Sequence, residues 1–202
     1  FINAGLWRRP QLYARAGESD LDAVNREVRA VRSQVGLVDV STLGKIDIKG
    51  RDAAEFLERV YINNWKTLAV GRVRYGVMLR EDGMVFDDGT TTRTGEQHYL
   101  MTTTTANAVK VMSTLEYLLQ VEWRELEVYL TSVTEQWAAM ALAGPDARRV
   151  LHAIAPEHDW SNAALPYMGY RSTTIAGIPA RVFRISFSGE LSYEINVEAD
   201  YG

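Results

Sequence analysis

The chain has 202 residues, of which 47% are apolar and 24% charged, and it carries a formal net charge of −4. These ordinary globular values exclude a disordered or fibrous chain. Basic residues are scattered rather than clustered, so we expect no nucleic-acid partner. The chain has no cysteine, which excludes a disulfide framework and a thiolate metal site and fits a cytoplasmic protein.

Neither a membrane span nor a metal site is expected. The longest uninterrupted apolar run, residues 137–143, is far shorter than the roughly 20 residues that cross a bilayer. The three histidines, His98, His152 and His158, lack the spacing of a zinc site.

The N-terminal part predicts an arm followed by a helix. Residues 1–18 show neither a helical nor a strand period. Ser19 with Asp22 forms a helix-capping pattern, and Gly36 is a typical stop. Between them, apolar residues spaced by three or four positions predict the buried face of a helix: Leu21, Val24, Val28, Val31 and Val35.

From Lys45 the pattern alternates and predicts an α+β unit. A strand at 45–49 is followed by a helix at 52–60, and Asp82-Gly83 predicts a hairpin turn. Thr105 is expected to cap a second long helix that reaches Gln120. The remaining expected strands are 71–79, 83–92, 99–104 and 125–130. This order is β-α-β-β-α-β with one additional strand, a ferredoxin-like arrangement with an antiparallel sheet.

A weak internal repeat predicts a second, related α+β unit. Residues 45–60 correspond to residues 139–154, and each copy ends a strand in Gly-x-Asp-Ala, whose Asp is expected to cap the next helix. Strands at 180–187 and 191–197 follow, but no closing helix does, so the second unit is expected to be incomplete. The expected segments are therefore an arm and helix at 1–44, a ferredoxin-like unit at 45–136 and the truncated unit at 137–202.

Two acidic positions are candidates for chemistry. Asp87 and Asp88 lie inside a strand, where Asp is rare, and adjacent strand residues point to opposite faces. Either carboxylate could serve as a base if partly desolvated, and the alternative is a carboxylate paired with an arginine or with backbone N–H groups. Glu194 lies on the polar face of its strand, where a merely solvated face is the simpler interpretation.

Four segments, in this order, resemble the folate-binding aminomethyltransferase family. They are 36–45 (GLVDVSTLGK), 71–88 (GRVRYGVML with DGMVFDD), 141–145 (ALAGP) and 184–195 (RISFSGELSYEI). The family includes the glycine-cleavage T-protein and the C-terminal domains of sarcosine oxidase and dimethylglycine dehydrogenase. The resemblance implies a truncated aminomethyltransferase fold, with residues 45–136 as the folate-binding unit.

Two further features are similar to one branch of this family. The arm 5–13 (GLWRRPQLY) looks like the start of this domain in the α subunits of heterotetrameric sarcosine oxidases. Gly44-Lys45 is similar to the oxidase and dehydrogenase branch, whereas T-proteins carry Ser-His-Met at the position of Ser41-Thr42-Leu43.

The resemblance assigns roles residue by residue. The family's catalytic aspartate follows a tyrosine of the folate pocket by thirteen positions, which matches Asp88 and Tyr75. The glutamate that hydrogen-bonds the pterin matches Glu194. The arginine that helps to hold folate falls beyond Gly202, so a complete folate site is not expected within these residues.

The implied activity is transfer of the one-carbon unit of a sarcosine-derived iminium to tetrahydrofolate, giving 5,10-methylenetetrahydrofolate. FAD, FMN and NAD would belong to the rest of the enzyme, and the β, γ and δ subunits would be partners. Two alternatives stay open: a stand-alone glycine-cleavage aminomethyltransferase acting on a lipoyl carrier, and a non-catalytic folate-binding or subunit-packing module. The arm segment Trp7-Arg8-Arg9-Pro10 and the pair Gly44-Lys45 argue against the first, and the presence of Asp88 argues against the second.

Overall fold

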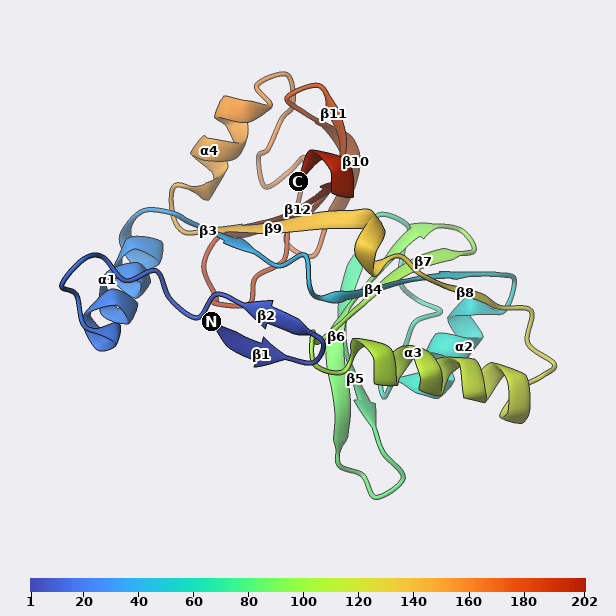
Figure 1. The fold of residues 1–202 in the computed structure, drawn as a ribbon. Helices are drawn as coiled ribbons and strands as arrows, with labels where there is room; N and C mark the ends of the chain where they lie inside the picture. The colour runs from blue at the N-terminus through green and yellow to red at the C-terminus, as the bar shows by residue number, and fades with distance from the viewer. The chain divides into compact units, whose positions relative to one another are not determined.

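The computed structural model describes all residues from Phe1 to Gly202, and the chain folds into two compact units (Figure 1). The terminal unit joins Phe1–Ser41 to Trp137–Gly202, and the central unit is Thr42–Gln136. Each contains one five-stranded sheet in which every neighbouring pair is antiparallel, as the α+β prediction requires. No helix is both long and apolar enough to cross a membrane.

The sheet of the central unit has the strand order β5-β6-β7-β4-β8. The chain order of its elements is the expected one, with β5 as the additional edge strand. The strands are β4 (Gly44–Lys49), β5 (Val73–Leu79), β6 (Val85–Gly95), β7 (His98–Thr103) and β8 (Tyr129–Ser132).

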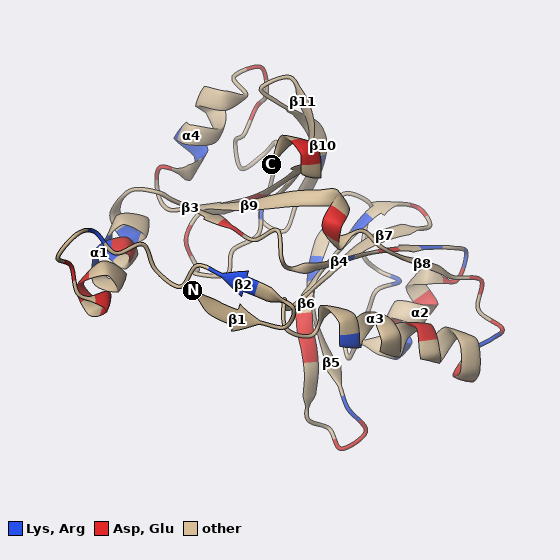
Figure 2. Cartoon of the chain, in the orientation of Figure 1, with Lys and Arg blue, Asp and Glu red and all other residues tan.

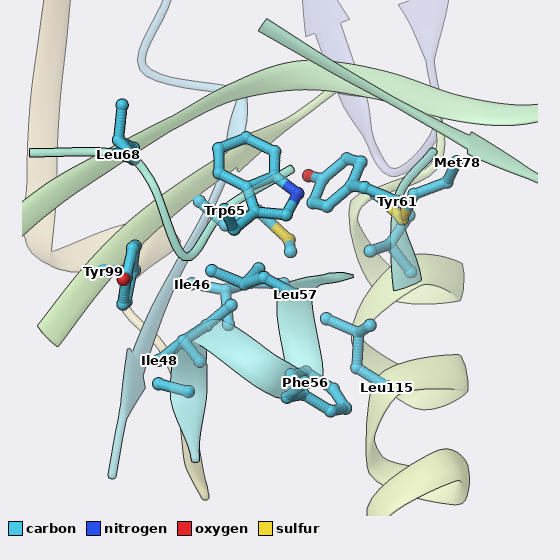
Figure 3. Close-up of a cluster of buried hydrophobic side chains, with 13 residues drawn as sticks. Ile46, Ile48, Phe56, Leu57, Tyr61, Trp65, Leu68, Met78, Tyr99 and Leu115 are labelled. Carbon is cyan, nitrogen blue, oxygen red and sulfur yellow. The ribbon is translucent and has the colours of Figure 1, made fainter. Parts of the chain in front are cut away.

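Two helices, α2 (Ala53–Val60) and α3 (Ala108–Tyr117), close the core of the central unit. Phe56 and Leu57 of α2 and Leu115 of α3 are almost completely buried against this sheet (Figure 3). Complete burial of side chains of this size contributes about 1.5–3 kcal/mol each. The core therefore lies between one face of the sheet and the two helices.

Three local predictions in this unit are wrong. Thr105 does not cap α3, which begins at Ala108 with Asn107 as its cap residue. The predicted continuation of α3 to Gln120 instead passes into a π-helical turn at Leu118–Glu122. The last strand begins at Tyr129 rather than at residue 125, because Leu126 and Val128 pack on the core without sheet pairing.

The sheet of the terminal unit has the order β10-β11-β12-β9-β3. Its strands are β3 (Gly36–Asp39), β9 (Trp137–Ala143), β10 (Tyr170–Ile175), β11 (Ile178–Phe183) and β12 (Ser192–Glu198). The sequence patterns had not indicated β3 or β10. Helix α4 (Ala147–Ile154) packs on one face through Leu151, and the repeat of strand and helix is confirmed by β4-α2 and β9-α4.

The N-terminal segment differs from its prediction in two respects. The arm contains a small hairpin, β1 (Ile2–Ala4) with β2 (Trp7–Arg9). Helix α1 (Asp20–Ser33) begins at the predicted Ser19 cap, whose hydroxyl oxygen accepts the N–H of Asp22. Its expected apolar face is not a core face, because Leu21, Val24 and Val28 are exposed and only Ala23 is buried.

The Gly-x-Asp-Ala turns keep their shape but not their predicted caps. Gly50 and Gly144 have φ angles of 139° and 129°, which side-chain-bearing residues rarely adopt. Neither Asp52 nor Asp146 makes a side-chain cap bond. The Asp52 carboxylate instead accepts the backbone N–H of Glu127, so it ties α2 to the segment before β8.

Candidate functional site

Asp88 and Tyr75 meet on neighbouring strands of the central unit. Asp88 stands opposite Val77, and Tyr75 stands opposite Thr90, in the register of β5 and β6. The Tyr75 hydroxyl donates a hydrogen bond of 2.7 Å to Oδ2 of Asp88. The acidic stretch of β6 is visible in Figure 2. The sequence separation of thirteen residues thus becomes a direct contact, because the hairpin folds the two positions onto one face of the sheet.

The carboxylate changes the acidity of the phenol. The hydrogen bond to Asp88 is the main cause that raises the pKa of Tyr75, since a phenolate at this distance would face a negative charge. Tyr75 therefore stays a protonated donor at neutral pH. Its side chain is 49% exposed, and Asp88 is half-buried, so the pair is accessible from outside the central unit's core.

Asp87 has a different environment, as expected for adjacent strand residues. It is 2% exposed, and its carboxylate accepts hydrogen bonds from the backbone N–H and hydroxyl of Thr104 and from the amide of Asn107. These bonds tie β6 to the turn that precedes α3. The alternative of a carboxylate hydrogen-bonded to backbone therefore fits Asp87, with further bonds from two side chains, and Asp88 is the more accessible of the two carboxylates.

A register shift between Met78 and Leu79 changes one detail of the predicted faces. Regular alternation would place Val85 and Asp87, two positions apart, on the same face, but Val85 is exposed and Asp87 is buried. The irregularity interrupts the alternation at the start of β6, and the regular alternation resumes at Asp87 and Asp88.

Sequence reasoning missed the threonines beside Asp88. Thr90 and Thr102 hold β6 and β7 together through a hydroxyl pair at 3.0 Å, and Thr102 Oγ1 also accepts the Thr90 N–H. Gly89 lies between Asp88 and Thr90, and a Cβ there would overlap the carbonyl oxygen of Thr102. The threonines at 102–104 had indicated only a strand. Their hydroxyls, together with Gly89, fix the backbone next to the Asp88 carboxylate.

Glu194 lies in the other unit, on β12, and its environment contradicts a solvated face. The residue is only 7% exposed. In the sheet register it stands between Phe183 of β11 and Ala141 of β9. A buried carboxylate requires hydrogen-bond donors. Glu194 is therefore a polar group built into the sheet, and the structure describes it within the terminal unit, separately from Tyr75 and Asp88.

No cluster of three or more His, Asp or Glu side chains could hold a metal ion. His98 pairs with Asp47 at 3.0 Å, and His158 contacts Thr173 at 2.7 Å. Each of these two histidines thus has a local polar partner.

The family model of the GCVT N-terminal domain matches residues 1–202. The chain is 52% identical over its full length to the sarcosine oxidase subunit alpha of Rhizobium meliloti strain 1021, of which it covers 21%. It is also 52% identical to the subunit alpha of Corynebacterium sp. strain U-96, again over 21% of that protein. The aminomethyltransferase of Geobacillus kaustophilus is 32% identical over 98% of this chain and 50% of its own length.

Solved structures show the same fold. The glycine cleavage system aminomethyltransferase T from Bartonella henselae superposes with a TM-score of 0.77 at 24% identity, covering 95% of this chain and 51% of that one. A chain of the heterotetrameric sarcosine oxidase from Corynebacterium sp. U-96 superposes with a TM-score of 0.62 at 19% identity, over 88% of this chain and 84% of that one. The chain thus spans about a fifth of the sarcosine oxidase alpha subunits that it matches in sequence and half of the aminomethyltransferase of Geobacillus kaustophilus.

Proposed function

Because this chain belongs to the GCVT N-terminal domain family, we propose that it is the folate-binding domain of a sarcosine oxidase α subunit. In this proposal the methylene carbon of the sarcosine-derived iminium forms bonds to two amine nitrogens of tetrahydrofolate and its bond to the amino acid nitrogen breaks. The products are 5,10-methylenetetrahydrofolate and glycine, whose nitrogen takes up the two protons released by the folate amines. The high identity to sarcosine oxidase α subunits along the whole chain supports the choice of branch. The other subunits of such an enzyme would be its protein partners.

The catalytic part rests on one observation, the 2.7 Å hydrogen bond between Tyr75 and Asp88. Bound tetrahydrofolate would supply the amine nitrogen that accepts the one-carbon unit. A carboxylate held by a single neutral donor keeps further lone pairs for accepting a proton. Asp88 would act as the general base, and Tyr75 would orient its carboxylate and pack against the ligand.

Binding of the pterin is assigned to Glu194. A carboxylate accepts only, so it fits the N–H-rich edge of a pterin. The burial of Glu194 supports this role, because hydrogen bonds to a charged acceptor away from water contribute more than exposed ones. Each of the proposed residues is therefore chemically suited to a reduced folate.

The test is Asp88→Asn in the full-length protein. Asparagine keeps the shape and can still accept a bond from Tyr75, but it cannot take a proton. We expect sarcosine oxidation to continue while formation of 5,10-methylenetetrahydrofolate falls about 10²–10⁴-fold and formaldehyde is released instead. Both products are measured in one reaction mixture.

Asp82→Asn is the matched control, because Asp82 is exposed in the β5–β6 turn and pairs with Arg80 at 2.6 Å. It should leave both products unchanged. An unchanged folate product in Asp88→Asn would reject Asp88 as the base and favour a non-catalytic folate-binding module. Transfer from a lipoyl carrier without any sarcosine oxidation would favour the stand-alone aminomethyltransferase.

A further inference from the structure

The strand that carries Glu194 also carries Asn196, a buried polar residue whose side-chain amide makes no hydrogen bond. Asn196 is 0% exposed, and neither its Oδ1 nor its Nδ2 has a hydrogen bond. Buried side-chain amides are nearly always hydrogen-bonded, and leaving one unpaired destabilises the fold by about 1–3 kcal/mol. An orphaned amide in a well-packed sheet therefore needs an explanation.

Asn196 shares its sheet face with Glu194. Residues two apart on a strand point to the same side and are about 6.6 Å apart, so one flat heterocycle can reach both. The opposite face of β12 carries Tyr193, Ile195 and Val197, which belong to the apolar core under α4. The face with Glu194 and Asn196 is thus polar although it is buried.

The neighbouring strands flank this polar row differently. On β9, Ala139 stands beside Asn196 and Ala141 beside Glu194, so only methyl groups project there. On β11, Arg181 stands beside Asn196. The Arg181 guanidinium lies 3.9 Å from the centre of the Trp137 ring, and its Nη1 is buried without a hydrogen bond. Two neighbouring donors, Asn196 Nδ2 and Arg181 Nη1, and one acceptor, Asn196 Oδ1, therefore lack hydrogen-bond partners.

We propose that Asn196, assisted by Arg181, binds the lactam edge of the pterin while Glu194 binds its amino edge. A side-chain amide matches a lactam in two bonds, since Nδ2 donates to the ring carbonyl and Oδ1 accepts the ring N–H. Arg181 Nη1 supplies a further donor for the carbonyl oxygen. This assignment rests on the proposed folate-binding function. It extends that function to a residue that recognises the carbonyl and the adjacent N–H of the pterin ring.

The test compares Asn196→Leu with wild type in the full-length protein by calorimetric titration. The probes are tetrahydrofolate and 6-methyltetrahydropterin, which has the ring but lacks the benzoyl-glutamate tail. We expect both affinities to fall by the same factor, about 10- to 100-fold, because the lost bonds are to the ring. The Tm without ligand should stay the same or rise, since the amide loses no partner.

Asn25→Leu, the same change at an exposed position of α1, controls for the added apolar side chain. Asn196→Ala is the second variant in case leucine does not fit, and it should weaken both probes equally. An unchanged affinity in a folded Asn196 variant would overturn this assignment, as would a loss confined to tetrahydrofolate, which would place the contact on the tail.

Failure of the proposed folate-binding function would give a different result from failure of the Asn196 assignment. If wild type binds neither probe, both the folate function and this assignment are rejected. If Glu194→Gln weakens binding while Asn196→Leu does not, the folate function stands and only the role of Asn196 is rejected.

Discussion

The two units repeat one layout but close their cores differently. In each, the fourth strand of the sheet, β4 or β9, leads through a Gly-x-Asp-Ala turn into a helix on the core face. Leu57 and Leu151 occupy equivalent positions and are both 0% exposed. The similarity of two short sequence segments thus reflects the same packing of one strand against one helix.

The difference lies in the second helix. In the central unit α3 covers the sheet beside α2, and Ile46 of β4 is only 2% exposed. In the terminal unit the equivalent residue, Met140, lines an open apolar groove of about 480 Å³ beside α4. The groove is lined mainly by aliphatic side chains of the sheet and α4, including Leu37, Leu142, Val150, Ile154, Ile195 and Val197.

This comparison separates two contributions to the fold. The turn and the first helix are fixed by local features that both copies share, above all a glycine with positive φ and a small buried alanine after the aspartate. The closure of the core depends on which further segment covers the sheet. The repeated strand and helix are therefore present in both units, and in the central unit a further helix, α3, covers the rest of the core face.

The largest expected effect is at the shared turn. A Cβ at Gly50 would overlap the carbonyl oxygen of Glu127, and one at Gly144 would meet the backbone of Val31 and Gln34. Gly50→Ala and Gly144→Ala should each destabilise their own unit by about 4 kcal/mol or more. Hydrogen exchange resolved by segment measures each unit separately.

Gly83 and Gly177 are the matched controls, because they also have positive φ but lie in open space. Their replacement by alanine should cost only about 1 kcal/mol. Equal losses at all four positions would mean that backbone conformation alone matters and that the close approach at the shared turn is unimportant.

A smaller pair of effects tests the difference between the cores. Phe56 of α2 and Val150 of α4 occupy equivalent positions, but Phe56 is completely buried whereas Val150 borders the groove. Phe56→Ala should cost about 3–5 kcal/mol, and Val150→Ala about 1 kcal/mol. Denaturant unfolding of the 202-residue chain measures the free energy of unfolding of both variants. Leu57→Ala and Leu151→Ala are the controls for the two helices, and they should cost as much as each other because both side chains are completely buried. A large loss from Val150→Ala would contradict the open groove.

Local patterns in the sequence predicted the features that depend on neighbouring residues, namely a strand, a turn and a helix cap. The alternation at Lys45–Lys49, the Asp82-Gly83 turn and the Ser19 cap all lie where expected. Strand β3 was missed because four residues carry too little pattern, and it forms through pairing with β9 about a hundred residues later. The apolar positions of α1 predicted the helix correctly but not its burial, since burial depends on what packs against it.

The candidate site shows the same division. The separation of Tyr75 and Asp88 and the choice of Glu194 came from family resemblance, and the hairpin register then explains why the first two touch. Asn196 gave no signal of its own, because an asparagine on the polar side of a strand is unremarkable until its burial is known. The different environments of Asp87 and Asp88 likewise became clear only from the positions of Thr104 and Asn107, which hydrogen-bond to Asp87.

The smallest expected effect concerns acid stability in the terminal unit alone. Glu18 accepts a two-pronged hydrogen bond from Arg26, both distances being 2.8 Å, and this bond is the main cause that lowers the pKa of Glu18 from 4.5 to about 2. Because the folded-state pKa lies below the unfolded one, the stabilisation is complete above pH 4.5 and is lost as the pH falls towards 2. The pair lies at the surface and is only partly buried, so salt should weaken it.

Glu18→Gln should therefore flatten the pH dependence of hydrogen exchange in α1 between pH 4.5 and 2 and leave the central unit unchanged. Glu116→Gln, an exposed change on α3, is the control and should not alter α1. A parallel change in both units would mean that they unfold together in acid. A change confined to the terminal unit would mean that the two units respond to acid independently, although the chain passes twice between them.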